Sequence, residues 1–207
     1  MSLKYSGTLE ITTRIGCSVN CVYCPQKQLV KRYHEMGKIS NKPVSMSLET
    51  FKKCIDKVPK DTRIDFSGMA EPWLNNECTK MVEYAHEQGY SIAVYTTLIG
   101  MTMNDWNILK DIPMEELVLH IPDDKSNSHI DVTPEYIALL QEVVHAKKNG
   151  VPIVSGYSCH AGIHQDIVAA IPKDGKLITE MQDRAGNLDN EYVEHHNPKG
   201  EILCINC

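Results

Sequence analysis

Three cysteines near the start of the chain have the residue type and spacing best suited to chemistry. Cys17, Cys21 and Cys24 stand in the run Cys-Ser-Val-Asn-Cys-Val-Tyr-Cys, with three residues between the first pair and two between the second. Thiolates this close on one loop can converge on one metal centre, and three sulfurs fit a four-iron cluster in which one iron has no protein ligand. An open coordination position is what a catalytic metal needs. The spacing therefore predicts a 4Fe–4S site.

Two other interpretations of these cysteines fit the sequence less well. A structural zinc site takes four Cys or His ligands, but the nearest fourth candidate is His34 and no second cysteine pair follows closely. Cysteines that only fill a core should share an apolar periodicity, which this loop lacks. The iron–sulfur interpretation is therefore favoured over both.

The elements that must position this loop alternate between strand and helix signals. Expected strands cover residues 9–15, 63–66, 91–95, 117–121, 151–154 and 176–181, and expected helices begin near residues 47, 75, 104, 133 and 163. Such a series predicts an α/β fold, a partial (β/α)6 TIM-like barrel with crossover helices and a parallel sheet. Chemistry in a parallel barrel lies at the carboxyl ends of the strands. Residues 26–43 are polar, and the tail from residue 183 to Cys207 is irregular.

A second motif follows the expected second strand and reads Ser67-Gly68-Met69-Ala70-Glu71-Pro72. Together with the cysteine spacing, and with the aromatic Tyr23 before the third cysteine, it resembles the radical S-adenosylmethionine (SAM) superfamily. That family carries a Gly-Gly-Glu-Pro type of turn, and Ala70 replaces one of its glycines here. The resemblance covers residues 9 to 187.

The resemblance implies that Cys17, Cys21 and Cys24 hold three irons of a 4Fe–4S cluster whose fourth iron binds SAM. Reductive cleavage of SAM would then give methionine and a 5′-deoxyadenosyl radical that abstracts hydrogen from a substrate. The resemblance also implies a set of residues around SAM: Tyr23, Gly68, Met69, Glu71, Thr97, His120 and Ser155.

The remaining cysteines divide into three groups. Cys54 and Cys78 share helical faces with apolar residues and are expected to be buried core thiols. Cys159 follows the expected fifth strand, next to histidines, and is a candidate catalytic thiol or an ordinary loop cysteine. Cys204 and Cys207 form a Cys-x-x-Cys pair at the end of a tail that resembles the start of a SPASM extension, so they are candidates for a second metal site, either an auxiliary cluster or zinc.

Two regions are therefore expected, a radical SAM core at 1–182 and a SPASM-like extension at 183–207. The resemblance implies an external electron donor, a flavodoxin or a ferredoxin, and leaves the substrate open among peptides, proteins and small molecules such as sugars. A non-catalytic iron–sulfur or electron-transfer protein is the alternative.

Composition narrows the class of protein. The 207 residues carry a net charge of −6, which disfavours a broad surface for nucleic acid. No apolar run approaches the roughly 20 residues that span a bilayer, and residues 1–15 lack the pattern of a signal peptide. The expected location is the cytoplasm, where thiols stay reduced.

Overall fold

A six-stranded sheet organises the computed structural model, which describes residues 7–37 and 44–180. Its strands run in the order β1, β4, β5, β6, β9, β10, and each neighbouring pair is parallel. Because this order follows the chain, each crossover joins neighbouring strands, as in a TIM-like barrel. The α/β prediction with a parallel sheet is confirmed, but within the described residues β1 and β10 do not pair and no barrel is closed. The strands are β1 (Gly7–Ile11), β4 (Thr62–Phe66), β5 (Ser91–Thr96), β6 (Glu116–His120), β9 (Gly156–Ser158) and β10 (Leu177–Ile178).

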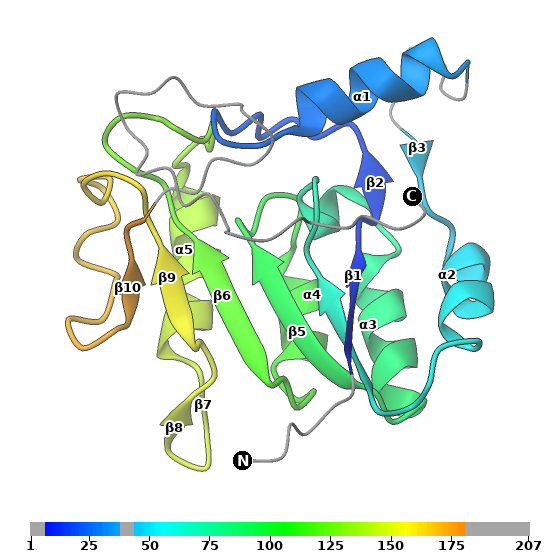
Figure 1. Cartoon of the computed structure of the whole chain (residues 1–207). Helices are drawn as coiled ribbons and strands as arrows, with labels where there is room; N and C mark the ends of the chain where they lie inside the picture. The colour runs from blue at the N-terminus through cyan, green and yellow to red at the C-terminus, as the bar shows by residue number, and fades with distance from the viewer. Residues whose placement is uncertain (1–6, 38–43, 181–207) are drawn as a thin grey trace, which may run out of the picture.

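Four helices cover one face of the sheet, and a fifth lies across the carboxyl ends of the strands (Figure 1). The covering helices are α2 (Leu48–Ile55), α3 (Cys78–Glu87), α4 (Met103–Leu109) and α5 (Pro134–His145), and the fifth is α1 (Gln26–Glu35). Two helix starts form as the sequence predicts. The hydroxyl of Ser47 accepts a hydrogen bond from the Thr50 amide at the start of α2, and that of Thr133 does the same for Tyr136 at the start of α5.

The two faces of the sheet differ in chemistry because side chains alternate along each strand. On the helix-covered face, Ile64, Phe66, Ile92, Val94 and Leu119 are almost fully buried in the main core. The residues between them point to the other face, which carries polar groups. The fold thus leaves one face of the sheet available for a site.

Four expectations differ from the structure. The strand expected at 151–154 is instead β8 (Val151–Pro152), which pairs antiparallel with β7 (Lys147–Lys148) in an exposed hairpin whose turn has positive φ at Asn149 and Gly150. The fifth strand of the sheet is β9, a few residues later. The helix expected at 163–170 is a series of turns, because its hydrogen bonds join residues three apart rather than four.

The third difference is α1, which lies in the polar stretch 26–43, where the sequence predicts no helix. None of its residues is fully buried, and its few apolar residues, Leu29, Val30 and Tyr33, share one face that is only partly buried. The strand expected at 9–15 also divides, because β2 (Arg14–Ile15) leaves the main sheet and pairs antiparallel with β3 (Val44–Ser45). In the part of the chain that the structure describes, no helix combines the length and apolar character that crossing a bilayer requires.

Candidate functional site

The three motif cysteines lie on the loop that connects β2 to α1. Their thiols are half-buried, and the loop turns through positive φ values of 96° at Gly16 and 46° at Asn20. The far side of the loop is fixed to the segment between β6 and α5, because Val22 donates its amide to the Asn127 carbonyl at 2.8 Å. The cysteine loop therefore extends over the carboxyl ends of the strands.

The thiol of Cys21 is perturbed by this environment. Burial, opposed by a hydrogen bond with Tyr23 and aided by the neighbouring Cys17 and Cys24, raises the pKa of this thiol to about 12. A thiol with so high a pKa is neutral at physiological pH, and a bound metal is the usual means of holding such a sulfur as a thiolate.

The turn after β4 contains the second motif. Gly68 has a φ of +88°, and a Cβ atom at this position would lie 2.1 Å from the Thr12 hydroxyl oxygen. Only glycine fits both the backbone conformation and the space. The next amide, that of Met69, donates to the same hydroxyl at 3.2 Å. The end of β1 thus fixes the turn that follows β4.

The structure brings the cysteine loop and this turn into contact. The Glu71 amide points at the Cys17 Sγ at 3.4 Å, and the Cys24 Sγ lies 3.8 Å from the Met69 carbonyl oxygen. The side chain of Gln26, the first residue of α1, bonds to both segments. Two motifs that are far apart in the sequence therefore form one surface.

Glu71 is the centre of a buried network rather than an exposed ligand. Its side chain accepts four hydrogen bonds: from the hydroxyls of Thr96 and Thr97 at 2.6 and 2.7 Å, and from the amides of Thr97 and Trp73 at 2.6 and 3.3 Å. Burial raises the pKa of the Glu71 carboxyl, while these hydrogen bonds lower it. The hydroxyl of Thr97, expected to face SAM, donates to Glu71.

A cavity of about 460 Å³ lies between the cysteine loop and the polar face of the sheet. Most of the sequence-predicted site residues line it: Cys17, Cys21, Tyr23, Cys24, Gly68, Met69, Glu71, Thr97 and His120. Because these residues come from the carboxyl ends of three strands and from the loop above them, the cavity stands where a parallel barrel places its chemistry.

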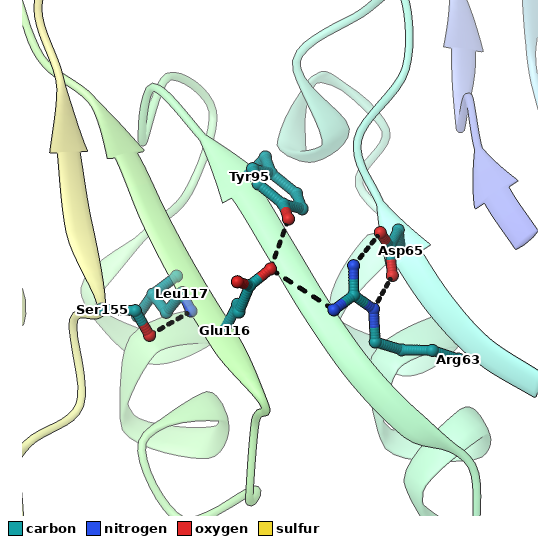
Figure 2. Close-up of polar contacts among 6 residues, drawn as sticks. All are labelled: Arg63, Asp65, Tyr95, Glu116, Leu117 and Ser155. Atoms are coloured by element: carbon teal, nitrogen blue, oxygen red, sulfur yellow. Dashed lines mark hydrogen bonds and ion pairs between the residues drawn. The ribbon is translucent and has the colours of Figure 1, made fainter. Parts of the chain in front are cut away.

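A network of charged and polar groups crosses the sheet below this cavity (Figure 2). The Arg63 guanidinium holds both carboxylate oxygens of Asp65, each at 2.7 Å, and reaches Glu116 at 3.4 Å. The Tyr95 hydroxyl donates to the same Glu116 oxygen at 2.5 Å. Asp65 and Tyr95 line the cavity. The floor is thus an ordered ionic network instead of the apolar layers that fill most barrels.

The wall opposite the turn is formed by the end of β9. The ring of His160 packs edge-to-face on Tyr23 with a centroid distance of 4.6 Å, and its Nε2 lies 3.3 Å from the Ser158 hydroxyl. All three residues line the cavity. The cysteine loop therefore also contacts the far edge of the sheet.

Sequence reasoning assigned no role to several lining residues, namely Glu10, Gln26, Asp65, Tyr95, Ser158 and His160. The sequence does indicate three of them as residues of the polar face, because they alternate with core residues along their strands: Glu10, Asp65 and Tyr95. It does not indicate Gln26, because the role of Gln26 depends on a contact with a distant turn.

Two candidate site residues of the described part of the chain, Ser155 and Cys159, do not line the cavity. Ser155 precedes β9 at its amino-terminal end, where its hydroxyl accepts from the Leu117 amide at 3.1 Å (Figure 2), so it is remote from the cavity. Cys159 is 1% exposed in the main core and does not line the cavity, so the role of a catalytic thiol is not supported. Cys54, expected in the core, is exposed, whereas Cys78 is fully buried as expected.

The three motif cysteines line the cavity with half-buried thiols. Among residues 7–37 and 44–180, no three His, Cys, Asp or Glu side chains gather closely enough to hold one ion. In a 4Fe–4S cluster each cysteine binds a different iron, so its sulfurs need not share the ligand sphere of one ion. Three half-buried thiols around one cavity fit that arrangement. Cys204 and Cys207 lie outside the described residues.

Comparison with known proteins gives distant structural likenesses. No family model matches the chain, and no curated protein matches it. BtrN in complex with AdoMet and 2-DOIA is similar with a TM-score of 0.48 and 18% identity, covering 81% of this chain and 60% of that chain. SeMet BtrN in an open conformation gives a TM-score of 0.41 and 18% identity over 58% of this chain and 51% of that chain. The chain spans 60% of the length of the first structure, and a likeness this distant does not assign it to a family.

Proposed function

We propose that this protein is a radical SAM enzyme in which Cys17, Cys21 and Cys24 hold a 4Fe–4S cluster. The observation that carries the proposal is the contact between the cysteine loop and the turn after β4, where the Glu71 amide meets the Cys17 Sγ at 3.4 Å. A cysteine loop that served only to bind metal would need no such turn beside it.

When bound, such a cluster would supply the electron that cleaves SAM into methionine and the 5′-deoxyadenosyl radical, which takes hydrogen from a substrate. The residues of the chain would bind and orient. The backbone of Gly68 and Met69 lines the cavity next to the thiols and would face the methionine amino group. Tyr23 and His120, from the other walls, would face the remainder of SAM.

Glu71 and Thr97 would act as supports in this site. Their mutual hydrogen bonds tie the turn after β4 to the end of β5, which keeps the turn in place when the cavity is filled. The lower cavity, bounded by Asp65 and Tyr95, remains for the substrate. An enclosed site of this kind protects a radical from solvent and competing donors.

The remaining parts of the proposal concern residues and partners beyond this cavity. We infer a core at 1–182, with 183–207 as an extension in which Cys204 and Cys207 would bind a second metal. A flavodoxin or ferredoxin would supply the electron, and the cytoplasm would be the location. The substrate would be a peptide, a protein or a small molecule such as a sugar.

Anaerobic reconstitution with iron and sulfide tests the proposal. Cys17→Ala, Cys21→Ala and Cys24→Ala should each lose the cluster and with it SAM binding, whereas Cys54→Ala, a change of an exposed cysteine remote from the cavity, should keep both. Iron and sulfide content and the equilibrium Kd for SAM are the measurements. A cluster that forms on these cysteines but leaves SAM unbound would replace the proposal with the electron-transfer alternative.

A further inference from the structure

The side chain of Gln26 joins the cysteine loop to the turn after β4. Its Oε1 accepts the Cys17 backbone amide at 2.6 Å, and its Nε2 donates to the Met69 carbonyl. Gln26 is half-buried at the start of α1 and lines the cavity. One side chain therefore bonds to the backbone of both motifs.

The chemistry of the two partners selects glutamine at this position. A backbone amide can only donate and a backbone carbonyl can only accept, so the orientation of the Gln26 amide is fixed by its neighbours. An ionised glutamate can only accept, and lysine or arginine can only donate. Asparagine has the right groups but is one methylene shorter.

Binding of metal by the cysteines would make this bridge more important. The Cys24 thiol also contacts the Met69 carbonyl, at 3.8 Å, but a thiolate that binds iron has no proton to donate. Gln26 would then be the side chain that still donates to this carbonyl. A carbonyl oxygen accepts two hydrogen bonds, so one position remains for a ligand amino group.

The Met69 peptide is held from both sides in this arrangement. Its amide donates to the Thr12 hydroxyl at 3.2 Å, and its carbonyl accepts from Gln26. The cysteine loop and α1 thus set the plane of a peptide group that lines the cavity beside the thiols.

We propose that Gln26 is a positioning residue that fixes the Met69 peptide relative to Cys17 and thereby sets the affinity for SAM. This inference rests on the proposed function, because it assumes that the methionine amino group meets the Met69 carbonyl. It goes beyond that function in assigning SAM affinity to a residue outside both motifs.

Three variants separate positioning from simple packing. Gln26→Ala removes both hydrogen bonds, and Gln26→Glu keeps the size and the acceptor for the Cys17 amide but has no donor for the Met69 carbonyl. Gln28→Ala is the control, an exposed glutamine of the same helical turn that does not line the cavity. The measurements are hydrogen exchange of the Cys17 amide in the metal-free protein, and the Kd for SAM per reconstituted cluster.

Positioning predicts a specific pattern. Gln26→Ala and Gln26→Glu should each bind SAM about tenfold more weakly, roughly the effect of losing one well-placed hydrogen bond, and Gln28→Ala should match the wild type. The Cys17 amide should exchange faster in Gln26→Ala only. SAM affinity of Gln26→Glu equal to that of the wild type would overturn the inference while leaving the proposed function intact. A wild-type cluster that does not bind SAM would overturn both.

Discussion

Replacement of Glu71 by glutamine tests whether this carboxylate supports the site as the structure indicates. Thr96 and Thr97 accept the Leu98 and Ile99 amides through their hydroxyl oxygens, which leaves each hydroxyl proton to point at Glu71. Both Glu71 oxygens are therefore acceptors, and each also receives a backbone amide. The Gln amide has one acceptor oxygen only, so in either orientation its NH₂ group faces a backbone N–H.

The expected magnitude follows from this geometry. Leaving one buried backbone N–H without an acceptor costs about 1–3 kcal/mol, and a bond to a charged group contributes about 1.5–3 kcal/mol. Part of this loss is offset, because a neutral amide costs less to bury than a carboxylate. Glu71→Gln should therefore lower the free energy of unfolding by about 2 kcal/mol.

Urea denaturation of the metal-free protein is the assay. Glu77→Gln is the matched control, since Glu77 uses one oxygen to accept the Leu48 amide at 3.1 Å, a bond that a Gln side-chain oxygen can keep. We expect the control to change stability by less than about 0.5 kcal/mol. If Glu71→Gln is as stable as the wild type, the folded protein carries a proton on this carboxyl and the hydrogen-bond directions given above are wrong.

Three further substitutions test other parts of the structure, each by urea denaturation. Gly68→Ala should lower the free energy of unfolding by more than about 2 kcal/mol, because the added Cβ would meet a threonine hydroxyl. Gly89→Ala, at a similar positive φ but in open space, should lower it by about 1 kcal/mol. Equal losses would contradict the close contact at Gly68. Arg63→Met leaves the Asp65 carboxylate without its guanidinium partner and should lower the free energy of unfolding by about 3 kcal/mol. In a double-mutant cycle, adding Asp65→Asn should restore part of this stability. Strictly additive losses would exclude the ion pair. Ser155→Ala should lower the free energy of unfolding by about 1 kcal/mol and leave the Kd for SAM unchanged. A change in this Kd above roughly threefold would show that Ser155 contributes to SAM binding.

The sequence was sufficient to predict the parallel α/β sheet because strong period-two strands alternate with capped helices. Ser47 and Thr133 cap their helices through side-chain hydrogen bonds, as their positions indicate. The prediction failed where the chain has little burial to guide it. Helix α1 buries no residue. The exposed strand β8 resembles a core strand in sequence only because the run from Val151 to Val154 is rich in valine and isoleucine.

Much of the candidate site could also be predicted, because motifs that end strands of a parallel sheet meet at one edge. The cysteine loop and the Gly68–Glu71 turn meet in this way. What could not be predicted was how polar groups pair across strands. Thr97 bonds to Glu71, and Arg63 to Glu116, through distances that depend on strand register and not on local sequence.

Ser155 and Cys159 show the same limit in another form. When a strand forms a few residues later than expected, a residue expected at its carboxyl end can lie at its amino end instead. A residue expected on one face of the sheet can likewise lie on the other face. Because the sheet strand is β9 rather than residues 151–154, Ser155 lies at its amino-terminal end and Cys159 enters the core.

The release of 5′-deoxyadenosine is the measurement that tests the central claim most directly. Reconstituted protein, SAM and a strong one-electron reductant are incubated anaerobically, and the nucleoside is quantified by liquid chromatography with mass detection. We predict that the wild type and Cys54→Ala release 5′-deoxyadenosine and methionine in equal amounts, and that Cys24→Ala releases neither. A wild type that carries its cluster and binds SAM but forms no 5′-deoxyadenosine, or a Cys24→Ala variant that forms as much, would contradict the account.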